Sequence, residues 1–164
     1  MHKITSLEQL ANREMIKEIV YLYGYALDQQ QWQLYESLFE AEIYMDYSAS
    51  IGQGHSGLQK FSAAQWVQNA RQFFEQLTAT QHLLIPRFIR LDDNQQEAVV
   101  NVLLQANHYW PQAKGDSIQR MIAEYDMKLR KQQDETWRIY ESVQSLAWNE
   151  GNWQIFEHAM QSDN

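Results

Sequence analysis

The sequence contains no cysteine, and its acidic residues outnumber its basic residues. The absence of cysteine excludes disulfides, thiolate zinc sites and cysteine nucleophiles. The 13 lysines and arginines stand against 21 aspartates and glutamates and form no basic stripe. Binding to nucleic acid or to an acidic membrane surface is therefore not expected, because both need clustered positive charge.

Long apolar runs and familiar catalytic motifs are also missing. Residues 1–15 lack the apolar stretch of a secretory signal, and no stretch approaches the ~18 apolar residues of a membrane span. We expect a cytoplasmic protein. The chain has no HExxH motif, no GxSxG motif, no glycine loop typical of phosphate binding and no closely spaced pair of histidines. Neither a metal nor a cofactor is therefore expected.

What the sequence does have is an apolar and strongly aromatic composition. Its 164 residues suit one domain, expected over 1–164. Apolar residues make up 45% of the chain, which is enough for a core, and the aromatic share of 13% is high. Such an aromatic excess indicates a tightly packed core, a pocket, an oligomer interface or a mixture of these.

The first half of the chain predicts mainly helices. Ser6 and Gln9 resemble a capping box, and apolar residues then recur at spacings of three and four as far as Leu27. This pattern predicts a long helix that ends near Asp28, and a second short helix follows around Trp32. Beyond it we expect a strand at 43–48, a glycine-rich loop at 50–57 and a third helix at 58–77.

The second half predicts strands. Stretches rich in Val, Leu and Ile, separated by short polar turns, predict four long strands at 80–91, 97–110, 118–131 and 136–148. Such strands form an antiparallel meander. Residues 149–164 are predicted to be a tail. Helices on one face of a curved antiparallel sheet leave a cavity between the layers, so an α+β fold with an interior pocket is expected.

Two of the five histidines fall within predicted strands and are candidates for chemistry. His108 shares its strand face with an apolar series, so it should be buried and needs a hydrogen-bond partner. In a hairpin centred on Asp93, facing residues have numbers that sum to roughly 186–190, which places His82 opposite residues ~104–108. The two are either satisfied structural histidines or neighbours in one pocket. No role is assigned to the remaining histidines, His2, His55 and His158.

Acid and hydroxyl side chains add further candidates. Asp28 ends the first helix, where the macrodipole disfavours an acid, so a partner such as a buried histidine is expected. An Asp–His pair would fix the imidazole tautomer and raise its basicity. Tyr47 either donates a hydrogen bond to a substrate carbonyl or belongs to the core. Glu124 and Asp126 share one face of the strand at 118–131, which is either an exposed ion-pair face or part of the pocket wall.

Several segments resemble the SnoaL-like group of the nuclear transport factor 2 superfamily: YGYALDQQQW, SLFEAEIYMDYS, ATQHLL, EYDMKLRKQQDETWRI and SLAWNEGN. The resemblance covers about residues 8–153 and is closest to scytalone dehydratase and bile-acid dehydratases. It implies a cone-shaped, cystatin-like fold, in which a curved antiparallel sheet packs against N-terminal helices around a deep pocket. It also implies four catalytic residues, which are Asp28, Tyr47, His82 and His108. The expected substrate-binding residues are Tyr25, Glu124 and Asp126.

The sequence departs from the dehydratase pattern at two places. Leu27 stands where the dehydratases have a tyrosine, and Glu124 and Asp126 replace two small polar pocket residues, which indicates a changed substrate. The expected function is a cofactor-independent dehydratase or isomerase for a small, mostly apolar carbonyl or hydroxy compound. The alternatives are a non-catalytic small-molecule-binding module and the small subunit of an aromatic-ring dioxygenase. In every case we expect a homo-oligomer, either a dimer or a trimer.

Overall fold

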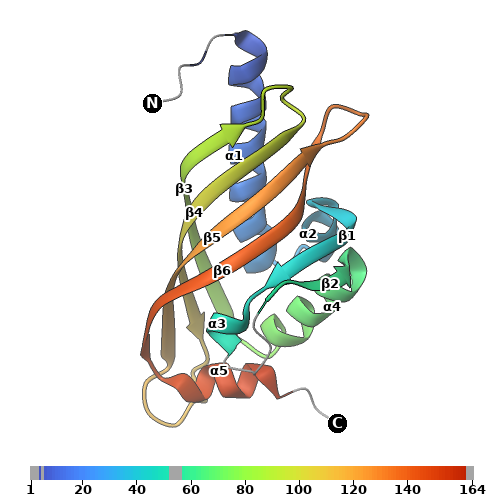
Figure 1. Cartoon of the computed structure of the whole chain (residues 1–164). Coiled ribbons are helices and arrows are strands. Elements are labelled where there is room, and N and C mark those ends of the chain that lie inside the picture. Colours follow the sequence, from blue (N-terminus) through green and yellow to red (C-terminus); the bar gives the residue numbers. More distant parts are fainter. Residues whose placement is uncertain (1–3, 5, 52–56, 162–164) are drawn as a thin grey trace.

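The computed structural model describes residue 4 and residues 6–51 and 57–161 (Figure 1). The helices in this part of the chain are α1 (Leu7–Asp28), α2 (Trp32–Ser37), α3 (Ser48–Ile51), α4 (Ala63–Phe74) and α5 (Trp153–Met160). The strands are β1 (Phe39–Asp46), β2 (Gln59–Ser62), β3 (Ala79–Leu91), β4 (Glu97–Tyr109), β5 (Ile118–Lys131) and β6 (Trp137–Gly151). His2, His55 and most of the loop predicted at 50–57 lie outside the described residues.

These strands form one curved sheet with the order β2-β1-β6-β5-β4-β3. From β3 to β6 each strand is antiparallel to the next, which confirms the predicted meander. β1 returns beside β6 and pairs with it in parallel. Figure 1 shows α1 running behind β3 and β4, while α4 and α5 lie near the lower end of the sheet. The α+β prediction is therefore confirmed, with helices covering one side of the sheet.

Helix α1 begins and ends where the sequence predicts. Ser6 caps its first turn, because the Ser6 side-chain oxygen accepts a hydrogen bond from the Gln9 backbone N–H at 3.0 Å. Ile16 and Val20, on the predicted apolar face, are fully buried. The helix ends at Asp28 and so delivers that carboxylate to the edge of β3.

The predicted hairpin register between β3 and β4 is also confirmed. His82 faces Ala106, and Thr80 faces His108. The inner face of β4 is buried along its whole length, through Val100, Val102, Leu104, Ala106 and His108. Two histidines on adjacent strands therefore point toward the same side of the sheet.

Two predictions in the first half need correction. The predicted helix at 58–77 begins only at Ala63, because residues 59–62 form β2 and pair with β1. The predicted strand at 43–48 begins earlier, at Phe39, where β1 meets β6. It also ends at Asp46, so that Tyr47 follows the strand.

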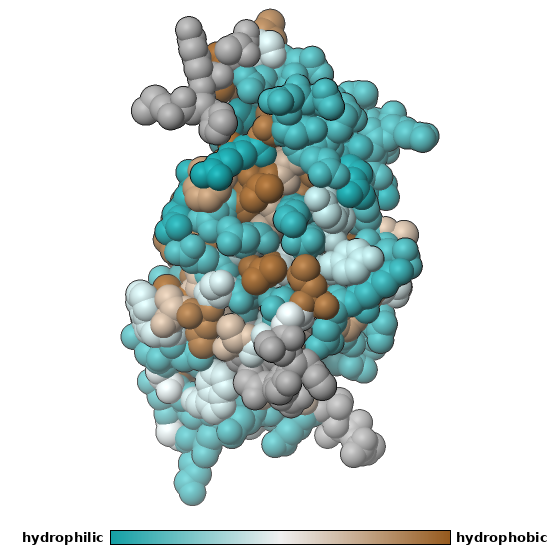
Figure 2. Space-filling view, in the orientation of Figure 1, coloured by the Kyte–Doolittle hydropathy of each residue, from teal (hydrophilic) through white to brown (hydrophobic). Residues whose placement is uncertain are grey.

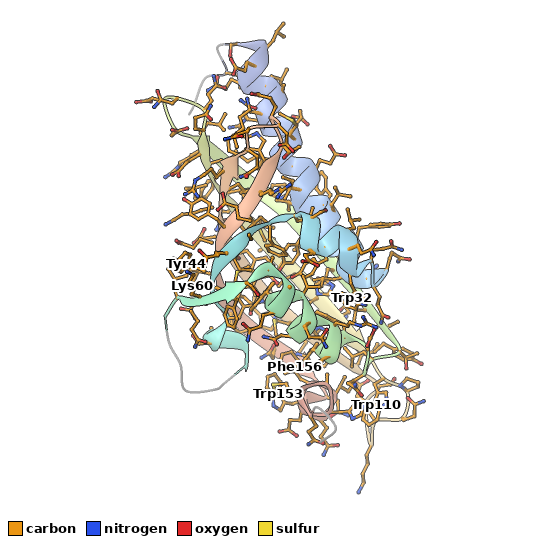
Figure 3. The ribbon with its side chains drawn as sticks, turned by 90° about the vertical axis from the view of Figure 1, so that its right-hand side faces the viewer. Trp32, Tyr44, Lys60, Trp110, Trp153 and Phe156 are labelled. Atoms are coloured by element: carbon orange, nitrogen blue, oxygen red, sulfur yellow. The ribbon has the colours of Figure 1, made fainter. Side chains whose placement is uncertain are left out.

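The predicted tail at 149–164 is wrong for most of its length. β6 continues to Gly151, and α5 follows after Asn152, whose side chain caps the helix. Ile155 and Phe156 are buried. Figure 3 shows Phe156 where α5 approaches α4. The C-terminal segment therefore helps to close the lower end of the fold.

The outward surface of the sheet is mixed in polarity. Figure 2 shows a mainly hydrophilic face with separate hydrophobic patches. Exposed apolar side chains on the long strands include Leu83, Ile85, Val99, Ile118 and Trp148. Within the described residues, no helix is long and apolar enough to cross a membrane.

Candidate active site

A cavity of about 280 Å³ lies between the sheet and helices α1, α4 and α5. Among the described residues, eighteen line the cavity; nine of these are Phe, Trp or Tyr, and none is Asp, Glu, Lys or Arg. His82, His108, Tyr47 and Leu27 are among them. Such a wall, largely apolar with a few convergent polar groups, is typical of a small-molecule site.

Asp28 and His82 form a hydrogen-bonded pair at this cavity. Oδ1 of Asp28 lies 2.6 Å from Nδ1 of His82 and also accepts a hydrogen bond from the Thr80 hydroxyl at 2.8 Å. The other carboxylate oxygen, Oδ2, accepts the backbone N–H of His82 at 2.8 Å. The His82 side chain is 3% exposed. The acid at the end of α1 thus has the histidine partner that its position calls for.

The charge on Asp28 follows from these contacts. Burial acts to raise the pKa of Asp28, but the hydrogen bonds from His82 and Thr80 outweigh it and hold that pKa below its ordinary value. The carboxylate is therefore ionised at neutral pH and accepts the proton that His82 carries on Nδ1. Nε2 of His82 is then the basic nitrogen of the ring.

His108 lies beside His82 but is held by an amide. The ring centres are 6.1 Å apart. Nδ1 of His108 lies 2.5 Å from Oε1 of Gln119, while Nε2 of Gln119 donates to Oδ1 of Asn149 at 3.2 Å. Because the Gln119 amide donates through its nitrogen, its oxygen is free to accept the Nδ1–H of His108. This series of hydrogen bonds leaves Nε2 of His108 without a proton, so that atom is a hydrogen-bond acceptor.

Burial dominates the electrostatics of His108. Its side chain is enclosed by the rings of Phe73, Phe74 and Phe156. Burial and, next, the charge of His82 lower the pKa of His108 from 6.5 to about 4. His108 is consequently neutral at physiological pH.

Tyr47 belongs to a cluster of tyrosines elsewhere in the cavity wall. Its hydroxyl lies 2.9 Å from that of Tyr23 and 3.3 Å from Oγ of Ser142. Its ring stacks on Tyr125, with ring centres 5.4 Å apart. Burial raises the pKa of Tyr47, so the phenol stays protonated and can donate a hydrogen bond.

The structure does not bring the three proposed substrate-binding residues to the cavity. Tyr25 is 55% exposed on the outer side of α1. Glu124 and Asp126 alternate with the buried Tyr125 and so point to the outer face of β5. There Arg87 donates to Glu124 at 3.0 Å, and Asn101 donates to Asp126 at 2.8 Å. The face of Glu124 and Asp126 is a polar, ion-paired face, and their assignment to substrate contacts is corrected.

Several wall residues escaped the sequence prediction, although some had a signal. Gln119 faces His108 in the β4–β5 register, and the predicted strands 97–110 and 118–131 already imply that pairing. Phe156 was missed because its segment was read as a tail. Gln144 and Tyr125 face each other on β6 and β5 and line the cavity together. Within the described residues, no group of three or more His, Asp or Glu side chains converges as a metal site.

Comparison with known proteins places this chain in a family. The sequence profile of the SnoaL-like domain matches residues 8–143. The chain belongs to the SnoaL-like family. No curated protein is significantly similar to the sequence.

Solved structures with the same fold share little sequence with this SnoaL-like chain. The Kfla4162 protein from Kribbella flavida is 17% identical, with a TM-score of 0.81 over 90% of this chain and 98% of that chain. A candidate scytalone dehydratase from Novosphingobium aromaticivorans is 15% identical, with a TM-score of 0.73 over 87% and 89%. Hexachlorocyclohexane dehydrochlorinase LinA-type3 from Novosphingobium barchaimii is 13% identical, with a TM-score of 0.68 over 89% and 93%. At these identities the likeness shows a common fold.

Proposed function

We propose that this SnoaL-like chain is a cofactor-independent lyase that removes a proton beside a carbonyl group and expels a hydroxyl group from the next carbon. The observation that carries the proposal is the pair of Asp28 and His82 at an apolar cavity. A half-buried carboxylate 2.6 Å from Nδ1 leaves Nε2 as a positioned base. Two neighbours in fold, a candidate scytalone dehydratase and a dehydrochlorinase, are described as elimination enzymes, which favours the same reaction class here.

The proposed reaction needs one base and one hydrogen-bond donor. Nε2 of His82 takes the proton from the carbon beside the carbonyl, and the electrons of the broken C–H bond form an enolate. The protonated hydroxyl of Tyr47 donates to the enolate oxygen, where negative charge develops. The enolate then re-forms the carbonyl and a C=C bond while the C–O bond breaks. The leaving hydroxide takes the proton back from His82 and departs as water.

In the proposed reaction His108 acts as a hydrogen-bond acceptor and not as a proton donor. With a pKa near 4 and its Nδ1–H directed at Gln119, His108 has no proton on Nε2 to give at neutral pH. It can instead accept a hydrogen bond from the substrate hydroxyl and so orient that group toward His82. A single histidine then both removes and returns the proton.

The cavity limits the class of substrate. Its volume of about 280 Å³ lies just below the ~300–1,000 Å³ range of ligand pockets. The part of its wall that the structure describes offers no charged side chain to a carboxylate or an ammonium group. An uncharged compound of one or two rings, with a β-hydroxy carbonyl group, fits these limits.

The test is elimination from small β-hydroxy ketones in deuterated water. With 3-hydroxy-1-phenylpropan-1-one as the probe, we expect enone formation by absorbance. We also expect deuterium beside the carbonyl of the remaining substrate by NMR, because the enolate can regain its proton at carbon from a His82 that has exchanged with the solvent. The His82→Gln variant should lose both signals, whereas His158→Gln, a change outside the cavity, should keep them. A probe that binds but returns unchanged and undeuterated from the wild-type protein would show a binding module instead and overturn the proposal.

A further inference from the structure

Gln144 carries an unsatisfied polar atom in the wall of the cavity. The residue is 6% exposed, and its Nε2 donates to the Tyr125 hydroxyl at 3.2 Å. Among the described residues, Oε1 of Gln144 is the one buried side-chain nitrogen or oxygen without a hydrogen-bond partner. Leaving a buried acceptor unpaired is costly, so its presence in an otherwise satisfied interior needs a reason.

The sheet register separates this atom from the histidines. Gln144 faces Tyr125 across β6 and β5, and Tyr125 faces Val102 on β4. His82 faces Ala106, four residues further along β4. Four residues of strand span roughly 13 Å. Gln144 and His82 therefore lie at different levels of the same cavity.

We infer that Oε1 of Gln144 accepts a hydrogen bond from a hydroxyl or N–H group of the substrate, on the side of the cavity where Tyr47 and Tyr125 lie and away from His82. This inference rests on the proposed function, because it takes the cavity as the substrate site. An O–H or N–H group of the ligand would donate a hydrogen bond to the unpaired Oε1 of Gln144. A ligand without such a group could not make this hydrogen bond. Gln144 thereby becomes a specificity residue that selects substrates with a second, uncharged polar group.

The surroundings of Gln144 narrow the chemistry of that group. Tyr125 beside it presents an aromatic ring, and the cavity wall contains no carboxylate that would favour a cationic donor. A phenolic or alcoholic hydroxyl on a flat apolar body suits this position best. The predicted substrate class is thus a hydroxylated aromatic ketone, with the carbon beside the carbonyl near His82 and the hydroxyl on the Tyr47 side, near Gln144.

Binding of three matched probes tests this inference without any turnover. The probes are 4-hydroxyacetophenone, 4-methoxyacetophenone and 4-methylacetophenone, which carry respectively a donor, an acceptor alone and neither. Calorimetry on the wild-type protein should show the hydroxyl probe binding on the order of tenfold tighter than the methyl probe. Equal binding of all three probes, or a preference for the methoxy probe, would overturn the inference.

Two substitutions assign the preference to Gln144. Gln144→Leu and Gln144→Met remove the amide while filling its space, and both should bind the three probes about equally. His158→Gln, outside the cavity, should keep the preference. His82→Gln should also keep it, so that a failure of the proposed chemistry is distinguishable from a failure at this position. A preference that survives in both Gln144 variants contradicts the inference.

Discussion

His82 and His108 line the same cavity with their ring centres 6.1 Å apart, yet their surroundings differ in one decisive respect. The Nδ1 atom of His82 meets a carboxylate, that of Asp28, whereas the Nδ1 atom of His108 meets the amide of Gln119. A carboxylate stabilises a positively charged imidazole, and an amide oxygen does so far less. The same residue type is therefore prepared as a base in one position and as a neutral acceptor in the other.

The chemistry of each histidine is decided by the group that its Nδ1 atom contacts. Both rings are buried and both lie on inward faces of adjacent strands, so neither burial nor strand position separates them. The difference arises from what the next element supplies: the end of α1 for His82, and the neighbouring strand β5 for His108. Exchanging or perturbing these partners should move the two histidines independently.

The largest effect is expected from Asp28→Asn. The amide can donate to Nδ1 of His82, which would move the ring proton to Nε2 and remove the base. We expect turnover of the β-hydroxy ketone probe to fall by roughly 10²–10⁴, the contribution of a positioned acid–base group. Thr80→Val, which removes one hydrogen bond to Asp28 but keeps its charge, should cost much less. Similar rates in Asp28→Asn and wild type, with matching circular dichroism spectra, would show that the carboxylate does not control His82.

The second effect concerns stability against acid. His108 binds a proton in the unfolded chain below pH 6.5 but in the folded chain only below about pH 4, so unfolding is favoured as the pH falls through this window. Because of His108, the free energy of unfolding should fall by about 3 kcal/mol between pH 6.5 and pH 4. Urea denaturation along this range should show the slope in the wild-type protein and a flatter curve in His108→Gln.

Two features separate this slope from other titrations. The lowered pKa of Asp28 contributes stability that is lost only as the pH falls below about 3.8, outside the window of His108. His158→Gln is the matched control, because it removes a histidine that stacks on Trp110 and leaves His108 in place. An unchanged slope in His108→Gln would mean that His108 is not the buried neutral group.

The third prediction converts one histidine environment into the other. Gln119→Glu places a carboxylate beside Nδ1 of His108, as Asp28 is placed beside His82. The pKa of His108 should rise by roughly 1–3 pH units. An NMR titration of the histidine ring signals measures this directly, and Asn149→Ala serves as the control that removes only the outer hydrogen bond of the chain. A pKa of His108 that stays near 4 in Gln119→Glu would refute the role of the amide.

The sequence pattern predicted the long strands well and the short or peripheral elements poorly. The boundaries of β3, β4 and β5 agree with prediction within a residue, because period-two alternation and polar turns mark them. β2 has four residues, and their mostly exposed side chains give no alternation. The helix α5 did carry a signal, since Trp153, Phe156 and Met160 are spaced by three and four.

The site was predictable to the extent that it depends on strand register. The β3–β4 hairpin brings His82 and His108 together, and that pairing follows from the position of a turn. The partner of His82 depends on how α1 docks against β3, which no local pattern fixes. For Glu124 and Asp126, the apolar alternation of Tyr125 and its neighbours already pointed to the opposite face as the inner one. That parity should have outweighed the resemblance to dehydratases.

The smallest expected effect tests the docking of α1 itself. A Cβ atom on Gly24 would lie 3.2 Å from the backbone oxygen and 3.3 Å from Cβ of His82, closer than most such contacts. Alanine in a helix interior is favoured over glycine by about 1 kcal/mol, which should largely offset the crowding in Gly24→Ala. The free energy of unfolding should change by less than about 1 kcal/mol, while β3 shifts enough to lower turnover several-fold.

In NMR spectra of Gly24→Ala, the ring signals of His82 should move and those of His108 should not. The control is Glu18→Ala, on the exposed side of α1, which should move neither set of signals. Equal changes at both histidines would mean that α1 positions the whole cavity wall, and the two histidines could then no longer be treated as separately held.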